Sequence, residues 1–222
     1  MGSFLAKYKR FALVMTLLSV VIIAAINHAL TPQKTLKIYQ PHDVNPEMVD
    51  TTIQFVKKYH TIADFTFTNQ NGDTITQDTF KDRIYIADFF FTTCATICPI
   101  MTGHMVKLQD ELQDDPQVML LSHTVTPETD DVARLNKYAA QKGVDARKWH
   151  LVTGDKKAIY DMARKSYLAA KDQPYNDYDL VHTENFVLVD TKRRIRGFYD
   201  GTDPEAIEQL LEDLAVLKKE GQ

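Results

Sequence analysis

A long uncharged segment near the N-terminus divides this chain into two parts that cannot share one core. Phe11–Ile26 contains no charged residue, and the uncharged stretch continues to Leu30. A transmembrane helix needs about 20 largely apolar residues, which this segment supplies. A buried helix of a globular domain is the alternative for a segment that is apolar all round. We expect residues 1–30 to be a basic N-terminus followed by an uncleaved signal anchor.

The charges around this segment indicate its orientation. Three basic residues precede it within Met1–Arg10, and a short basic N-terminus ahead of the first apolar segment favours a cytoplasmic N-terminus. The chain has 2 cysteines, and neither follows the segment closely, which excludes a lipoprotein anchor. We therefore expect a single-pass protein of the inner, or cytoplasmic, membrane, with its soluble domain on the exported, periplasmic-type side.

The rest of the chain is long enough for one domain with a sizeable core. Residues 31–60 contain Pro32, Pro41 and Pro46 without clear periodicity, which predicts a spacer. Residues 61–222 then form the domain. The net charge is −4, and no basic cluster outside the N-terminus indicates binding to nucleic acid.

Strand-like and helix-like segments alternate along this domain, and this order predicts its fold class. The predicted strands are Phe65–Thr68, Thr74–Thr76, Ile84–Phe91, Val118–Leu121, Trp149–Val152, Phe186–Val189 and Ile195–Tyr199. The predicted helices cover Ile100–Leu112, a segment opening at Thr126-Pro127-Glu128, a segment after Gly154-Asp155, and a segment after Asp203-Pro204-Glu205. Strands that alternate with amphipathic helices, with hairpins at both ends, predict an α/β domain with a central mixed sheet covered on both faces.

The only two cysteines lie four residues apart, directly after a predicted buried strand. Cys94 precedes a predicted helix and Cys98 lies in its first turn. The free N–H groups at a helix N-terminus stabilise thiolates and lower the pKa of cysteine. We therefore expect both sulfurs to be reactive at neutral pH, and residues four apart face the same side of a helix.

A close pair of cysteines can serve in three kinds of site: a copper site, a structural zinc site or a disulfide. Soft sulfur donors suit Cu(I). Structural zinc ordinarily needs four protein ligands, and the chain has no second cysteine pair. A structural disulfide remains the plain alternative, although so short a loop would add little stability.

A third metal ligand would be a histidine, and the chain has 7 of them. His28 lies at the membrane end, His42 in the spacer and His60 before the first hairpin. His104 is expected to turn away from the cysteines, and His150 to be a core or rim residue. His123 and His182 remain, each beside an apolar strand. Spacing alone does not decide between a ligand and a structural role for His182.

With these residues in view, the stretch from about Ile62 to Leu217 resembles the Sco (SenC) family of copper chaperones for cytochrome c oxidase. The matching elements are Asp64-Phe65 with the first hairpin, Phe89–Thr93, Cys94-Ala95-Thr96-Ile97-Cys98-Pro99, Trp149–Asp155, and His182 ahead of Phe186–Asp190. The resemblance implies a thioredoxin-like fold. It also implies copper bound by Cys94, Cys98 and His182, and delivery to, or thiol reduction of, the binuclear copper site of the oxidase.

The sequence departs from the family pattern at two places. The family often has Ser-x-Asp-Pro where this chain has Val125-Thr126-Pro127, and its usual Asp before the ligand histidine is Val181 here. A carboxylate near an imidazole ligand orients the ring. The candidates for that role are Asp179, Glu184 and Asp88, and a core carboxylate is an equal alternative for Asp88.

Three functions follow from these residues. The first is a metallochaperone whose partners are the copper-site subunit of cytochrome c oxidase and an upstream copper donor or thioredoxin-like reductase. The second is a thiol–disulfide reductase that uses only the Cys94–Cys98 redox pair and acts on oxidase-subunit cysteines. The third is a copper-sensing or redox-sensing binding module, with Lys171–Asp179 as a candidate surface or, alternatively, an ordinary solvent loop.

Overall fold

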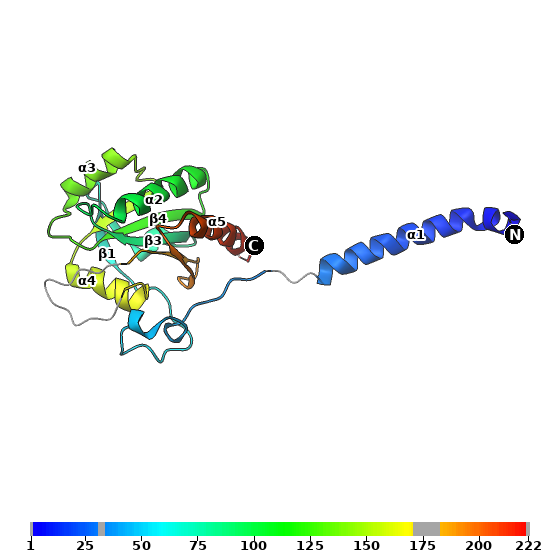
Figure 1. The fold of residues 1–222 in the computed structure, drawn as a ribbon, viewed down its shortest axis with the longest axis horizontal. Coiled ribbons are helices and arrows are strands. Elements are labelled where there is room, and N and C mark those ends of the chain that lie inside the picture. The colour runs from blue at the N-terminus through cyan, green and yellow to red at the C-terminus, as the bar shows by residue number, and fades with distance from the viewer. Residues whose placement is uncertain (1, 31–33, 171–182, 221–222) are drawn as a thin grey trace. The chain divides into compact units, whose positions relative to one another are not determined.

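The computed structural model of the protein describes residues 2–30, 34–170 and 183–220 (Figure 1). It divides into two compact units, Met1–Thr35 and Leu36–Gln222. The first is built on one helix, α1 (Gly2–Leu30), and the second contains every described strand.

Helix α1 has the length and composition of a membrane span. Its apolar window, Tyr8–Asn27, has a mean hydropathy of 2.1 and is 0% buried. A signal sequence meets the same criteria of length and composition, so α1 is a candidate membrane anchor.

Seven strands form one mixed sheet in the described part of the second unit, in the order β2-β1-β5-β4-β3-β6-β7. The strands are β1 (Thr66–Asn69), β2 (Thr74–Thr76), β3 (Ile84–Phe90), β4 (Val118–Thr124), β5 (Trp149–Thr153), β6 (Asn185–Val189) and β7 (Ile195–Asp200). The central strands β3, β4 and β5 are parallel, and the outer pairs are antiparallel. The predicted mixed sheet is thus confirmed.

The turn of the first hairpin follows from its sequence. Gly72 has a φ of +86°, a conformation that favours glycine, and its N–H donates to the carbonyl of Asn69. The side-chain oxygen of Asn69 also accepts from the N–H groups of Asn71 and Asp73. The Asn-Gly signal therefore marks the turn correctly.

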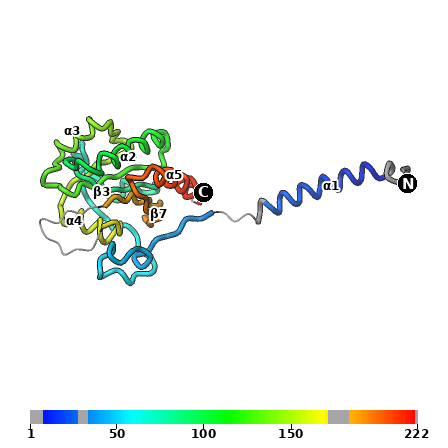
Figure 2. Tube along the Cα trace, viewed as in Figure 1, coloured from blue at the N-terminus to red at the C-terminus, as the bar shows by residue number. Residues whose placement is uncertain are grey.

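Helices cover both faces of the sheet (Figures 1 and 2). Helices α2 (Cys98–Leu112), α3 (Val132–Lys142) and α5 (Pro204–Glu220) share one apolar cluster with side chains of the central strands. Helix α4 (Lys156–Asp161) and the π-helical turn η4 (Met162–Ser166) belong to the cluster on the opposite face.

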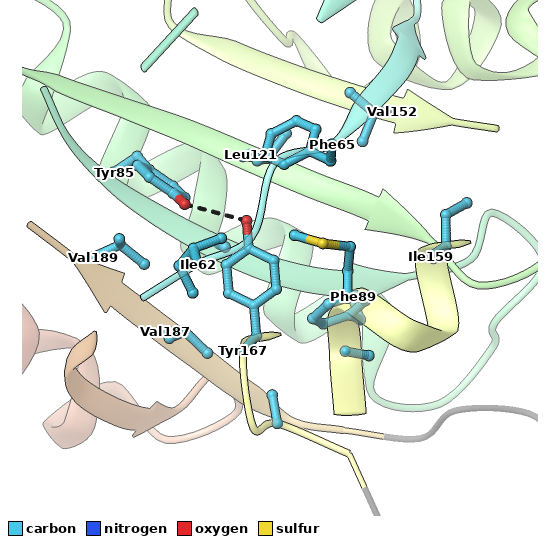
Figure 3. Packing of buried hydrophobic residues seen from close by; sticks show 14 of the residues in the cluster. Ile62, Phe65, Tyr85, Phe89, Leu121, Val152, Ile159, Tyr167, Val187 and Val189 are labelled. Atoms are coloured by element: carbon cyan, nitrogen blue, oxygen red, sulfur yellow. Dashed lines mark hydrogen bonds between the residues drawn. The ribbon is translucent and has the colours of Figure 1, made fainter. Parts of the chain in front are cut away.

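Alternation along β3 explains why two separate clusters form. Successive side chains of a strand point to opposite faces of the sheet. Tyr85 and Phe89 therefore pack with Tyr167 in the α4-side cluster, where the Tyr85 and Tyr167 hydroxyls lie 3.4 Å apart (Figure 3). Ile86 and Phe90 pack on the other face with α2.

Much of the stretch for which we expected a spacer belongs to the second unit. Residues 36–60 include the 3₁₀ turns η1 (Pro41–Asp43) and η2 (Pro46–Met48), and Val49 is fully buried. The N–H of Tyr39 donates to the carbonyl of Ile195 at 2.9 Å, and the Tyr39 ring packs edge-on against Phe198. These contacts make residues 36–60 part of the folded unit.

The expected helix start at Thr126-Pro127-Glu128 is wrong. Helix α3 begins at Val132, and its N-cap is Asp131, whose side chain accepts from the N–H of Arg134. Thr126 instead opens a turn, and its hydroxyl donates to the carboxylate of Asp130. The threonine satisfies a buried acid rather than the end of a helix.

Candidate metal and redox site

The cysteine pair lies where β3 passes into α2. The Cys94 N–H donates to the carbonyl of Phe91 at 3.3 Å, which turns the chain after the strand. Cys98 is the first residue of α2, with Pro99 in the first turn, where a missing N–H costs nothing. Cys94 is half-buried, whereas Cys98 is 3% exposed and packs in the cluster beneath α2.

The Cys94 sulfur lies over the helix start. The Cys98 N–H points at the Cys94 sulfur at 3.4 Å, and the hydroxyl of Thr96 lies 3.7 Å from it. Burial alone would raise the pKa of the Cys94 thiol. Hydrogen bonds from the Cys98 thiol, from backbone N–H groups and from Thr96 outweigh it and lower the pKa to about 7. The thiolate form of Cys94 is therefore more accessible near neutral pH than that of an ordinary cysteine.

Cys98 behaves in the opposite way, which corrects the expectation that both thiols are activated. Burial, and next to it the hydrogen bond that the thiol donates to Cys94, raise the pKa of the Cys98 thiol to about 12. The helix start therefore activates the outer sulfur only, because the inner one is desolvated. Both thiols are free in the structure, and the Cys98 thiol is hydrogen-bonded to the Cys94 sulfur.

Asp88 lies on the same face of β3 as the side chains that pack against α2. It is 2% exposed, and its charge acts on Cys98 and on Tyr138. Burial raises the pKa of Asp88 to about 7, against a hydrogen bond from Ser122 that lowers it. The Ser122 hydroxyl accepts from Trp149 Nε1 at 2.8 Å, so its own proton is available to Asp88. Asp88 is thus a buried acid beside the cysteine site.

The predicted histidine ligand is not among the residues that the structure describes. His182 and Asp179 both lie in 171–182, outside the described residues. Glu184 is described and exposed, and its carbonyl accepts from the N–H of Gly201. Among the described residues, no group of three or more His, Cys, Asp or Glu side chains could hold a metal ion.

The described histidines next to strands or helices have other environments. His123 is fully buried among Phe65, Phe67 and Tyr167, in the cluster on the face opposite Cys98. His104 Nδ1 lies 2.7 Å from the carbonyl of Gly201. His150 is buried next to Asn69.

Sequence reasoning gave no role to three residues beside the site, which are Thr92, Asp130 and Tyr138. Thr92, two residues before Cys94, is hydrogen-bonded to the buried carboxylate of Asp130. The hydroxyl of Tyr138 on α3 lies 2.8 Å from that of Thr102 on α2, and burial raises the pKa of Tyr138. The helical spacing marks Tyr138 only as a core position, and nothing in the local sequence distinguishes Asp130 from its neighbour Asp131.

The sequence of the chain matches a known protein family. The sequence model of the SCO1/SenC family matches residues 54–218. A SCO1 protein homolog of Bacillus subtilis (strain 168) is 32% identical over 155 residues, which make up 69% of this chain and 80% of the relative.

Solved structures of Sco proteins have the same fold. BsSco has 31% identity and a TM-score of 0.61. It is a member of the Sco family of cytochrome c oxidase assembly proteins, and a disulfide switch has been identified in it. That match covers 71% of this chain and 93% of BsSco. ScoI of Bradyrhizobium japonicum, solved with copper bound, has 25% identity and a TM-score of 0.55, covering 68% of this chain and 98% of its own.

Proposed function

The chain belongs to the SCO1/SenC family, and from that membership we propose that it is a copper metallochaperone that serves cytochrome c oxidase assembly. Copper is its cargo, held by the sulfurs of Cys94 and Cys98 and by the imidazole of His182. The binuclear copper site of the oxidase is the destination, and the copper-site subunit of the oxidase is the partner. We also propose that α1 remains as a single-pass anchor in the inner membrane, with residues 36–222 on the exported side.

The observation that carries this proposal is the convergence of two free sulfurs at one helix start. Thiolates are the protein ligands that Cu(I) prefers, and a metal ion replaces the protons of its thiol ligands. The Cys98 N–H adds a positive dipole next to the Cys94 sulfur. Copper binding would therefore release the proton that burial holds on Cys98, so copper affinity should increase with pH.

Removing the imidazole is the direct test. We expect His182→Ala to lower Cu(I) affinity by at least about tenfold, since it removes one of three proposed ligands. The affinity of the reduced full chain in detergent is measured by competition with a chromophoric Cu(I) chelator. His42→Ala is the matched control, because that ring is about half exposed and contacts Asp43. Equal affinities for the two variants, or no stoichiometric copper uptake by the reduced wild type, would contradict the proposal.

The unequal environments of the two thiols favour a second candidate function, a thiol–disulfide reductase. The half-exposed Cys94, with a pKa lowered to about 7, suits attack on a partner disulfide. The buried Cys98 would then displace the reduced partner and close a Cys94–Cys98 disulfide. This function needs no imidazole, so His182→Ala would leave the rate of disulfide reduction unchanged. Cys98→Ser would instead trap the mixed disulfide, which mass spectrometry detects.

A further inference from the structure

Asp130 is a fully buried carboxylate in the loop after β4, and the cysteine mechanism described above does not use it. Its side chain is 0% exposed. Oδ2 accepts from the Thr92 N–H at 3.0 Å, the Thr124 hydroxyl at 2.6 Å and the Thr126 hydroxyl at 3.0 Å. Oδ1 accepts from the Thr92 hydroxyl. All four hydrogen bonds bring donors to the carboxylate, which is the pattern of a charged acceptor.

Two of these hydrogen bonds come from one residue of the cysteine loop. Thr92 lies two residues before Cys94 and offers both its N–H and its hydroxyl to Asp130. Arg134 Nε donates to the same hydroxyl at 2.7 Å and lies 3.5 Å from Asp130 Oδ1. The Val125 N–H also donates to the carbonyl of Phe90, which joins the same two loops. The start of the cysteine loop is therefore bound to the loop after β4 at several points.

Among the described residues, few such contacts reach the remainder of the cysteine loop. Between Thr92 and the first residue of α2, Thr93, Ala95 and Thr96 are exposed. Cys94 itself is held by its N–H bond to Phe91 and by the contact of its sulfur with the Cys98 N–H. The distance between the two sulfurs thus depends on how firmly the loop is fixed at Thr92.

We propose that Asp130 is a positioning residue that fixes the cysteine loop through Thr92, so that the Cys94 sulfur stays over the start of α2 and beside Cys98. This inference rests on the proposed copper-binding function for its consequence in metal affinity. Its consequence for the reactivity of Cys94 needs only the loop geometry. Sites of this kind work only when their ligands are held to within about 0.5 Å.

A neutral amide cannot replace the carboxylate in this network. In Asp130→Asn, the amide oxygen can keep the Thr92 N–H, but the NH₂ group then faces the Thr92 hydroxyl. That hydroxyl already accepts from Arg134, and its own proton loses its acceptor. The variant therefore loosens Thr92 while leaving the size of the side chain unchanged.

The test compares Asp130→Asn with Asp131→Ala in the reduced full chain in detergent. Asp131→Ala removes the N-cap of α3 and so destabilises the start of the helix that follows Asp130. Asp131 makes no contact with Thr92 among the described hydrogen bonds. We expect Asp130→Asn to weaken Cu(I) binding, measured by chelator competition, by about tenfold or more. We also expect it to slow alkylation of Cys94 by iodoacetamide at pH 7 several-fold, followed by peptide mass spectrometry. Asp131→Ala should change neither quantity by more than twofold.

A second pair of variants tests the same link from the other side. Thr92→Val removes the hydroxyl and should reproduce both effects, whereas Thr92→Ser keeps it and should retain wild-type values. If Asp130→Asn and Thr92→Val match Asp131→Ala in both measurements, the positioning role is overturned. If wild type takes up no copper while the two variants still slow the alkylation of Cys94, the proposed copper function fails and the positioning role stands.

Discussion

The two cysteines lie four residues apart but in different environments. Cys94 lies half-buried over the N–H of Cys98, whereas Cys98 is packed beneath α2. The helix start lowers the pKa of the first thiol to about 7, and desolvation raises that of the second to about 12. Such a pair has one thiol ready to attack or bind and one that loses its proton only when its sulfur binds a metal ion or forms a disulfide.

Asp88 should make stability depend on pH at the residue scale. Its pKa is raised from 3.8 to about 7 in the fold, so ionisation is less favourable in the folded state than in the unfolded state. Between about pH 4 and pH 7 the folded protein holds one more proton here than the unfolded chain. Stability through this group therefore falls as pH rises, by at most about 1.4 kcal/mol per pH unit.

The neutral variant Asp88→Asn removes this dependence. We expect the free energy of unfolding of the variant minus that of wild type to increase as pH rises from about 4 to 7. Above that range the difference should stay constant. Urea denaturation of the reduced protein, followed by the fluorescence of the single tryptophan, Trp149, measures it. A difference that stays constant across these pH values would show that the fold does not raise the pKa of Asp88.

His123 is a second residue whose environment makes a sharp prediction. Neither ring nitrogen has a hydrogen-bond partner of good geometry among the described residues, and aromatic rings surround it. Burial lowers its pKa to about 3, and an interaction with the backbone of Asp88 offsets this only in part. His123→Phe should therefore stabilise the protein by about 1–3 kcal/mol, because it removes unpaired buried polar atoms.

Thermal unfolding measures this gain. The matched control is His150→Phe, since the ring of His150 is also buried but has Asn69 as a partner. We expect the control to be neutral or destabilising. A loss of stability in His123→Phe would mean that the imidazole has a polar partner or a packing role that phenylalanine cannot supply.

At the scale of elements, two adjacent loops form the site. The carboxyl ends of parallel neighbouring strands lie at one edge of a sheet, so the loops after β3 and β4 meet there. The first carries the cysteines, and the second carries Asp130 and the N-cap of α3. The Thr-Pro-Glu pattern imitates a helix start, but the α3 helix begins six residues later than Thr126 because that threonine bonds to Asp130.

At the scale of the whole molecule, the folded unit starts much earlier than its strands do. Arg196 is 3% exposed and donates to the carbonyls of Leu36 and Lys37, and it also pairs with Asp190 and Glu220. The segment that follows the candidate anchor is therefore bound to the last helix and to β7. Residues 36–60 help to complete the domain.

Truncation tests this boundary. A fragment of residues 36–222 should unfold at the same urea concentration as the full chain, whereas residues 61–222 should lose about 3 kcal/mol or more. The shorter fragment deprives buried Arg196 of two acceptors, and hydrogen bonds to charged groups contribute about 1.5–3 kcal/mol each. Fluorescence of Trp149 reports both transitions. Equal stability of the two fragments would mean that residues 36–60 are a spacer after all.

The sequence by itself determined the local elements and the family. Apolar periodicity located β3, α2 and the second hairpin, because burial of one face requires side chains at regular intervals. The short loop between β3 and α2 placed Cys94 and Cys98 together, since residues that close in sequence cannot separate. Sequence position narrowed the candidate histidine to His123 or His182, and the family resemblance alone chose His182, whose place relative to the sulfurs stays a prediction.

Only the tertiary structure decided what happens between distant residues. It showed that Cys98 is desolvated rather than activated, that Asp88 shares the face of the cysteines, and that Asp130 reaches back to Thr92. Solvent exposure and long-range hydrogen bonds depend on which elements pack together, and local sequence does not encode that. The segment from Phe11 forms part of α1, a candidate membrane anchor, whereas the region after it, expected to be a spacer, contributes Val49 to the core.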